Sequence, residues 1–234
     1  MRVCHSLKIT TIIDPLHGFL YSGIHRKRLM PQKDTGPSIE SLKCNFVSGA
    51  VLHRFRFGGG RKQDLPKAAG LRGGKTPEIV DATAGLGKDA FLLASLGAKV
   101  TLIERSGLMH KLLKKGMEDA RKMGGDVAAV VERMELIHGD ACEILKYLSP
   151  EVIMIDPMHP PRKKSALVNS EMRLVREIVG DDTDYPALIK VALKMASNRV
   201  VLKLPRYADT VEGIKEVSHQ ILGKSTRYDV FMTT

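Results

Sequence analysis

The sequence predicts an α/β fold with a mostly parallel central sheet and a small N-terminal accessory segment. From Glu78 onward, short apolar runs alternate with amphipathic stretches of helical length, a pattern typical of parallel strands covered by helices on both faces. A chain of 234 residues, 43% hydrophobic and 27% charged, is long enough for one such domain with an appendage. We therefore expect the accessory segment at 1–70 and the main domain at 71–234.

The N-terminal part carries the weaker patterns. Residues 1–40 show no clear periodicity and include the basic, turn-rich stretch HRKRLMPQKDTGPS. Residues 42–63 predict a possible strand, a short helix and a basic loop from Gly58 to Lys62. Three consecutive glycines in that loop disfavour regular structure.

The main domain predicts five strands, each followed by a helix or turn. Its apolar runs place the strands at 78–83, 98–106, 134–140, 151–157 and 198–205. Amphipathic or apolar stretches predict helices at 88–97, 108–123, 141–148, 165–180 and 185–196. Residues 219–234 predict two further strands around a turn.

The charge balance indicates a polyanionic partner. Lys and Arg number 37 against 26 Asp and Glu, for a net charge of +11, which favours nucleic acid, although some proteins are basic without binding it. Three widely spaced cysteines, Cys4, Cys44 and Cys142, support neither a disulfide framework nor a zinc cluster. We expect no metal, a reducing cytoplasm and, since no apolar run is long enough, no membrane span.

The stretch DATAGLGKDA, residues 81–90, fits three different ligands. It is one residue short of a phosphate-binding P-loop, because Asp89 stands where a Ser or Thr hydroxyl is needed for magnesium. From Gly85 to Ala90 it satisfies the dinucleotide pattern G-x-G-x-x-A. The third ligand is S-adenosylmethionine, which lacks phosphate and carries a sulfonium and an ammonium group.

Acidic residues at the predicted strand ends favour S-adenosylmethionine. Gly85 and Gly87 let the backbone approach a ligand, Glu104 can accept both ribose hydroxyls, and Asp140 can accept the adenine amino group. Asp81 and Asp89 suit a cationic cofactor and would repel phosphates. For each acid the alternative is a helix N-cap or first-turn position, and for Asp89 taken alone the two interpretations are about equally favoured.

The stretch DPMHPP, residues 156–161, predicts the methyl-acceptor site. Asp-Pro after a buried strand makes a rigid loop, in which the Asp156 carboxylate and the Pro157 carbonyl can grip an exocyclic amine and position its nitrogen. His159 can stack on a base, act in proton transfer or cap the loop. A simple strand-end turn is the alternative for the whole stretch.

Basic residues near these loops are candidates for phosphate contacts, with solvated loops as the alternative. The candidate RNA-binding residues are Arg54, Arg56, Arg61, Lys62, Arg162, Lys163, Lys164 and Lys203.

Five blocks together resemble the ribosomal RNA small subunit methyltransferase J family. They are VSGAVLHRFRFGGGRKQDLPKAAGL, VDATAGLGKDAFLLASLGAKVTLIER, LIHGDA, DPMHPPRKKSALVNSEMR and VVLKLPRYA, in order from about residue 43 to the C-terminus. The resemblance implies a class I S-adenosylmethionine-dependent methyltransferase (Rossmann-like) fold and methylation of a guanine N2 amine in 16S rRNA or the small ribosomal subunit. It places cofactor contacts at Lys88, Asp89, Glu104, Arg105, Asp140, Ala141 and Asp156.

The chain departs from the family pattern at two site positions and at its start. His159 stands where a Phe is usual and Lys88 where an Arg is usual, and the first forty residues do not resemble the family's N-terminal subdomain. Two other functions remain open from the residues: a nicotinamide-dependent oxidoreductase and a non-catalytic RNA-binding protein.

Overall fold

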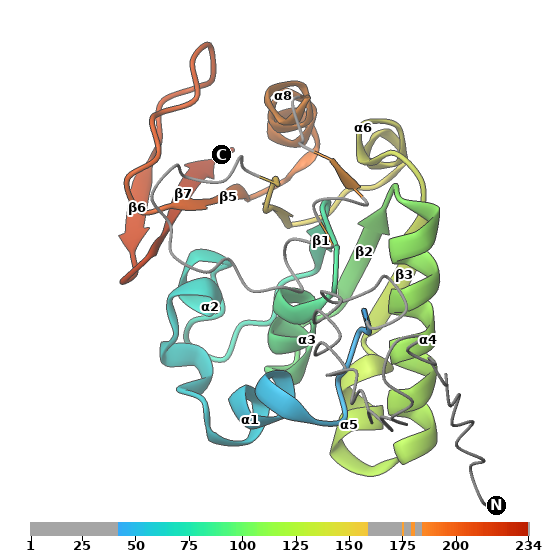
Figure 1. Ribbon diagram of the computed structural model, residues 1–234. Coiled ribbons are helices and arrows are strands. Elements are labelled where there is room, and N and C mark those ends of the chain that lie inside the picture. The colour runs from blue at the N-terminus through green and yellow to red at the C-terminus, as the bar shows by residue number, and fades with distance from the viewer. Residues whose placement is uncertain (1–41, 159–174, 176–178, 181–183, 234) are drawn as a thin grey trace, which may run out of the picture. The chain divides into compact units, whose positions relative to one another are not determined.

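The computed structural model describes residues 42–158, 175, 179–180 and 184–233. The chain divides into two compact units, Met1–Thr35 and Gly36–Thr234, and every described residue belongs to the second. Figure 1 shows this unit as a sheet with helices on both sides.

Seven strands form one sheet in the order β3-β2-β1-β4-β5-β7-β6. Strands β1 to β5 run parallel, whereas β7 is antiparallel to both β5 and β6. Their bounds are β1 Ile79–Asp81, β2 Val100–Glu104, β3 Met134–His138, β4 Val152–Ile155, β5 Arg199–Pro205, β6 His219–Leu222 and β7 Thr226–Met232. The five predicted parallel strands and the C-terminal strand pair are confirmed.

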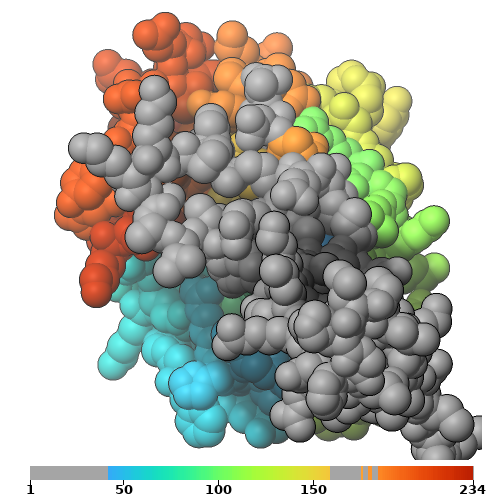
Figure 2. Space-filling view, in the orientation of Figure 1, coloured from blue at the N-terminus to red at the C-terminus, as the bar shows by residue number. Residues whose placement is uncertain are grey.

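Helices cover the two faces of the sheet with separate hydrophobic clusters. One face carries α1 Gly49–Phe57, α2 Asp64–Ala68, α3 Lys88–Ser95, α4 Gly107–Met123 and α5 Gly125–Val131, and the other carries α6 Ala141–Ile144 and α8 Tyr185–Met195 (Figure 1). Two 3-10 turns, η2 Gly60–Lys62 and η3 Leu145–Tyr147, extend this set. The hairpin of β6 and β7 lies against α2 (Figure 2).

The strand expected before α1 is wrong. Residues 42–46 alternate between buried and exposed like a strand, but they pair with no strand of the sheet. Their buried side chains Leu42, Cys44 and Phe46 pack instead in the hydrophobic cluster that also contains the side chains of α3 and α4. The alternation therefore reports an extended segment lying on helices, because period-two burial requires only one covered face.

Short helices were missed by the sequence patterns, and one predicted loop holds a turn of helix. α2 and α5 have five and seven residues, and η2 lies within the basic loop expected at Gly58–Lys62. Of the helix expected at 165–180, only Val175, Val179 and Gly180 are described, and the two valines are helical.

Residues 42–70 share a core with the main domain. Leu65, Ala68 and Ala69 lie in the same cluster as the side chains of α3 and α4, so the boundary expected after residue 70 does not coincide with a break in packing. Within the described residues, no helix combines the length and the apolar character that crossing a membrane requires.

Candidate active site

A cleft opens where the parallel strands β1 to β4 end, the edge at which ligands bind in sheets of this kind. The space between its lining residues, open solvent included, is about 650 Å³. Among the described residues its lining is Ala82, Thr83, Gly85, Ile103, Glu104, Arg105, Gly139, Asp140, Ala141, Cys142, Asp156, Met158, Val175, Val179, Asp184, Tyr185 and Leu188.

Glu104 at the end of β2 is the best-anchored acid of the cleft. Its side chain is buried, its Oε2 accepts the Gly85 N–H at 2.8 Å, and its Oε1 accepts the Ser106 N–H at 2.7 Å. The carboxylate thereby joins the loops that follow β1 and β2. Because each carboxylate oxygen has more than one acceptor position, Glu104 can also bind hydroxyl groups in the cleft.

The two glycines of the loop after β1 have different roles. Gly85 has φ 51° and lines the cleft. Gly87 has φ 67°, and a Cβ there would lie 2.7 Å from Leu113 Cδ1 and 3.2 Å from Phe46 Cζ. Gly87 therefore serves the packing of the loop against the core, and it is absent from the described lining of the cleft.

Asp140 and Ala141 begin α6 at the far wall. The Asp140 Oδ1 accepts the Cys142 N–H at 2.7 Å and caps the helix. Asp140 therefore is a helix cap, as the alternative interpretation held, and it also lines the cleft. Burial raises the pKa of the Cys142 thiol, which keeps it neutral at physiological pH. Ala141 contributes the first turn of α6 to the lining.

An ion pair joins two sides of the cleft rim. The Arg105 Nη1 lies 2.9 Å from Asp184 Oδ2 and 3.2 Å from Asp184 Oδ1. Arg105 follows β2, and Asp184 precedes α8. The pair holds the start of α8 over the strand ends.

Asp81 is buried at the base of the loop and lies outside the described lining of the cleft. Burial raises its pKa to about 7, the Thr83 N–H acts against this, and the charges of Asp89 and Asp156 add to the rise. No ammonium or guanidinium within the described part of the chain forms an ion pair with Asp81. A ligand cation near these acids would relieve their mutual repulsion.

Asp156 follows β4 and lines the cleft. Its N–H donates to Thr83 Oγ1 at 2.7 Å, its side chain is exposed, and Pro157 behind it is buried. The loop therefore presents a carboxylate beside the cleft with its backbone fixed to the loop after β1. His159 lies outside the described residues.

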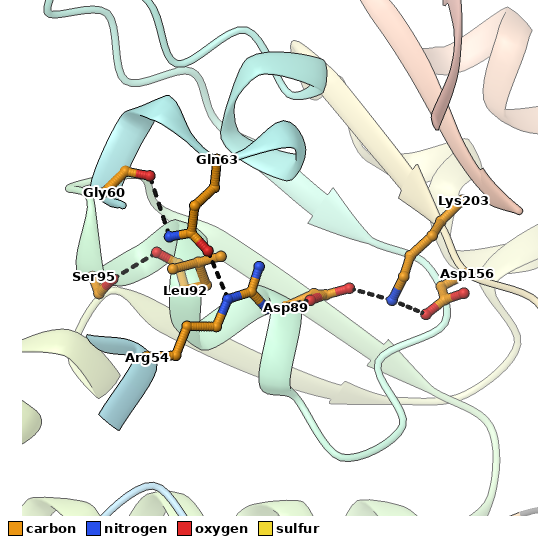
Figure 3. A network of polar contacts seen from close by, with 8 residues as sticks. All are labelled: Arg54, Gly60, Gln63, Asp89, Leu92, Ser95, Asp156 and Lys203. Atoms are coloured by element: carbon orange, nitrogen blue, oxygen red, sulfur yellow. Dashed lines mark hydrogen bonds and ion pairs between the residues drawn. The ribbon is translucent and has the colours of Figure 1, made fainter. Parts of the chain in front are cut away.

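Lys203 on β5 lies in a different environment from the phosphate contact we expected. Its Nζ lies 2.7 Å from Asp89 Oδ2 and 2.7 Å from Asp156 Oδ2, between the start of α3 and the end of β4 (Figure 3). Burial acts to lower the pKa of Lys203, but Asp156 and Asp89 outweigh it and raise that pKa. Lys203 is thus a charged, internal partner of two carboxylates.

The other basic candidates fall into three groups: those with internal partners, those exposed, and those outside the described residues. Arg54 contacts Gln63 and Asp89, and Arg61 donates to the Lys75 and Leu96 carbonyl oxygens at 2.7 and 2.9 Å, so both stabilise the fold. Arg56 and Lys62 are exposed. Arg162, Lys163 and Lys164 lie outside the described residues, and Lys88 lies at the start of α3, beyond the described lining of the cleft.

Several lining residues were not predicted. Thr83 was missed although it stands inside DATAG, and the apolar side chains of Met158, Val175, Val179, Tyr185 and Leu188 carry no sequence signal beyond ordinary core character. Asp184 had one usable signal, an acid just before a Tyr-Pro helix start.

The described residues suit a cofactor with an uncharged ring and a positively charged end better than they suit a metal ion. Acidic and apolar side chains line the cleft together, the acids being Glu104, Asp140, Asp156 and Asp184, whereas Asp81 and Asp89 lie outside its described lining. Across the described ranges, no group of three or more His, Cys, Asp or Glu side chains is arranged to hold a metal ion.

Comparison with known proteins gives consistent relatives. The family model described as "Putative SAM-dependent methyltransferase" matches residues 17–233. The chain is 61% identical over 193 residues to ribosomal RNA small subunit methyltransferase J of Agrobacterium fabrum, covering 82% of this chain and 93% of that protein. It is 62% identical over 191 residues to the protein of the same name from Brucella anthropi, again covering 82% and 93%.

A solved structure agrees with these sequence matches. The crystal structure of an SAM-dependent methyltransferase from Neisseria gonorrhoeae is 31% identical, covers 82% of this chain and 74% of that chain, and superimposes with a TM-score of 0.65.

Proposed function

Because this chain belongs to the ribosomal RNA small subunit methyltransferase J family, we propose that it methylates the exocyclic N2 amine of a guanine in 16S rRNA. It is an S-adenosylmethionine-dependent rRNA methyltransferase with a class I methyltransferase fold. The target base and atom are the part that we propose. The observation that carries this part is Asp156 in the lining of the cleft, with its backbone N–H bonded to Thr83 and its carboxylate bonded to Lys203.

The cleft residues divide the work of holding the cofactor. Glu104 accepts the ribose hydroxyls, Asp140 and the first turn of α6 face the adenine, and the acids near β1 compensate the cationic end. Bound there, S-adenosylmethionine supplies a methyl group on a positively charged sulfur, which is electrophilic without further activation. The protein therefore has to position its two substrates and exclude water, and it needs no strong base.

Asp156 and Pro157 hold the acceptor amine. An exocyclic amine has two hydrogens to donate, and the carboxylate of Asp156 with the carbonyl of Pro157 supplies two acceptors. Holding both hydrogens fixes the direction of the nitrogen relative to the methyl group. Since Asp156 is exposed, a proton lost from the methylated amine reaches solvent directly or through this carboxylate.

The RNA side of the proposal rests on charge. The net charge of +11 and the exposed side chains of Arg56 and Lys62 provide cations for phosphate groups. The expected base stacking by His159 and the phosphate contacts of Arg162, Lys163 and Lys164 remain part of the proposal. We place the enzyme in the cytoplasm, where ribosomal RNA is made and assembled.

Membership of a methyltransferase family decides against the nicotinamide-dependent oxidoreductase that the glycine pattern also allowed. The acids Asp81 and Asp89 also disfavour a dinucleotide, because its pyrophosphate would lie at the start of α3, where Asp89 lies.

The test is methyl transfer followed by mapping. Purified protein is incubated with methyl-labelled S-adenosylmethionine and either naked unmethylated 16S rRNA or small-subunit particles, and the modified nucleotide is identified by mass spectrometry. We expect one labelled N2-methylguanine, and Asp156→Asn should lose transfer while still binding the cofactor. Label on an adenine or cytosine would refute the guanine assignment, and RNA binding without any transfer would favour a non-catalytic RNA-binding protein.

A further inference from the structure

We propose that Lys203 is a positioning residue that fixes the Asp156 carboxylate for the substrate amine through a direct ion pair, and that Asp89 and Arg54 anchor Lys203 in an ion-pair chain from β5 to α1. The inference rests on the proposed role of Asp156 in holding that amine. It assigns Lys203 to the reaction itself, in place of the phosphate contact that its charge suggested.

The chain joins four elements that are distant in the sequence. Lys203 Nζ lies 2.7 Å from Asp156 Oδ2 and 2.7 Å from Asp89 Oδ2, and the other oxygen of Asp89 lies 3.5 Å from Arg54 Nη1. Arg54 is in turn held by Gln63, whose Oε1 accepts its Nε–H at 2.8 Å. Figure 3 shows the four charged groups in one line, from α1 across the start of α3 to the end of β4.

The ammonium is placed to act on Asp156. The Lys203 side chain is 24% exposed, against 46% for Asp156, so the cation lies on the protein side of the carboxylate. A charge-assisted hydrogen bond at this distance restricts the rotation of a carboxylate. Because each oxygen has further acceptor positions, Asp156 can keep this bond while it accepts a hydrogen from the amine.

The surrounding charges argue against a phosphate at Lys203. The groups that face it are Asp81 from β1, Asp89 from α3, Asp156 after β4, Tyr228 from β7 and Arg54 from α1. Three carboxylates against two cations leave this neighbourhood net negative when Asp81 is ionised. A phosphate would be repelled there, whereas an exocyclic amine, which presents only hydrogens, would be attracted.

Asp89 provides the second anchor. A lysine side chain has four rotatable bonds and loses much conformational freedom when it is fixed, so one carboxylate in an exposed loop is a weak restraint. Asp89 stands in the first turn of α3 and holds the ammonium from the rigid side. Asp89, the residue that breaks the P-loop pattern, thus restrains Lys203, and Lys203 in turn restrains Asp156.

The experiment compares Lys203→Met, Lys203→Arg and Asp89→Asn with Lys224→Met. Lys224 is an exposed lysine in the turn between β6 and β7 and serves as the matched control. For each variant we measure the single-turnover methylation rate at saturating RNA and cofactor, the Kd for the cofactor, the Kd for RNA at several salt concentrations, the pH profile of the rate, and the melting temperature.

We expect Lys203→Met to lower the saturating rate about 10²-fold, the size of effect that misplacement of a reacting group by about 1 Å produces. The Kd for RNA should stay within about threefold of that of the unchanged protein. The acid limb of the pH–rate profile should move to higher pH, since a carboxylate without its ammonium neighbour binds a proton more readily. Lys203→Arg should restore part of the rate, Asp89→Asn should lose less than Lys203→Met, and Lys224→Met should match the unchanged protein.

Two results would overturn the proposal. One is a Lys203→Met protein with an unchanged saturating rate, a weaker RNA Kd and a salt slope reduced by about one, which is the behaviour of a phosphate contact. The other is a rate that falls only in proportion to a lost melting temperature or a lost affinity for the cofactor, in Lys203→Met and Lys203→Arg alike, which would make Lys203 structural.

A measurement without turnover separates this proposal from the proposed function. In protein labelled with ¹³C at aspartate carboxyls, the Asp156 signal, assigned with Asp156→Asn, should titrate at higher pH in Lys203→Met than in the unchanged protein. If the unchanged protein methylates a different atom but this change in titration is present, the guanine assignment fails and the ion-pair chain stands. If the change is absent, the positioning role is wrong whatever the base.

Discussion

The carboxylate of Glu104 joins two loops before any ligand binds. It accepts backbone N–H groups of Gly85 and Ser106 through its two oxygens, so both loops are held in the arrangement that the cofactor needs. Such preorganisation lowers the conformational cost of binding. The affinity for S-adenosylmethionine should therefore depend on Glu104 more strongly than a contact to two ribose hydroxyls alone would require.

We expect Glu104→Gln to weaken cofactor binding about 10- to 100-fold, because hydrogen bonds to charged groups contribute about 1.5–3 kcal/mol and the new amide turns a donor toward one of the two N–H groups. Isothermal titration calorimetry measures the effect. Glu135→Gln, an exposed position on β3, is the control and should bind normally. Equal affinities for both variants would contradict the role of Glu104.

Asp81 makes the stability of the protein depend on pH near neutrality. Burial raises its pKa to about 7, while the unfolded chain releases the same proton near pH 4. Between about pH 4 and pH 7 the folded state holds more protons than the unfolded state, so this group makes the free energy of unfolding fall as pH rises through that window. Within the window, the fall amounts to at most about 1.4 kcal/mol for each step of one pH unit.

Asp81→Asn removes this cost and keeps an oxygen for the Thr83 N–H. We expect the variant to gain melting temperature over the unchanged protein, with a gain that grows from pH 5 to pH 8. Thermal unfolding in the absence of cofactor measures it. A gain independent of pH, or none at pH 8, would show that the folded state ionises Asp81 without this cost.

At the residue scale, the sequence predicted the identity of the cleft acids better than the roles of the cations. Glu104, Asp140 and Asp156 follow strands, and strand ends in a parallel sheet converge. Lys203 and Arg61 also lie near loops, but their partners come from residues 47, 114, 14 and 35 positions away in the chain. No local pattern encodes such pairs, so charge alone suggested RNA.

At the scale of elements, the extended segment 42–47 is held against α4 by the absence of one side chain. A Cβ on Gly116 would lie 2.4 Å from the Cys44 carbonyl oxygen and 2.8 Å from Cys44 Cβ. The glycine lets Leu42, Cys44 and Phe46 reach the core. The helix accepts a residue of low helix propensity at this position in exchange for that contact.

Gly116→Ala should destabilise the protein by about 1–3 kcal/mol, the usual cost of overpacking, although alanine itself favours the helix by about 1 kcal/mol. Gly107 lies in the same helix, and a Cβ there would lie 3.7 Å from its nearest neighbour, His138 Nε2. Gly107→Ala should therefore leave stability unchanged or raise it. Urea unfolding of both variants measures the difference. A stable Gly116→Ala protein would show that the segment moves without cost.

The same scale shows which elements a single sequence can predict. The strands β1 to β5 are apolar runs at the heart of the sheet, and the long helix α4 has a clear helical period, so both were found. α2 and α5 have five and seven residues, less than two full turns, and tertiary contacts rather than local pattern keep them helical. The segment 42–46 has the burial period of a strand without a partner, and burial alone does not determine pairing.

At the scale of the whole molecule, the excess positive charge should appear as a salt-dependent affinity for RNA. Each phosphate contact adds about 0.7–0.9 to the slope of log affinity against log salt concentration. Arg56 and Lys62 are exposed on α1 and in the turn after it, whereas Lys99, 78% exposed, precedes β2 and is paired with Glu78. The position of a lysine, and not the net charge alone, should decide its effect.

We expect Arg56→Gln and Lys62→Gln each to reduce the slope by about one and Lys99→Gln to leave it unchanged. Fluorescence anisotropy with a labelled rRNA fragment, across a series of salt concentrations, measures the three slopes. Equal slopes in all three variants would mean that RNA binds through other residues.

The order of the last three strands also constrains how the protein is made. β7 follows β6 in the chain but lies between it and β5, so the sheet cannot grow in the order of synthesis. Until β7 is inserted, β5 offers an unpaired edge to other chains, and the Lys203 that it carries stands beside that edge. The edge of β5 is therefore covered only when the last strand of the described chain has been inserted beside it.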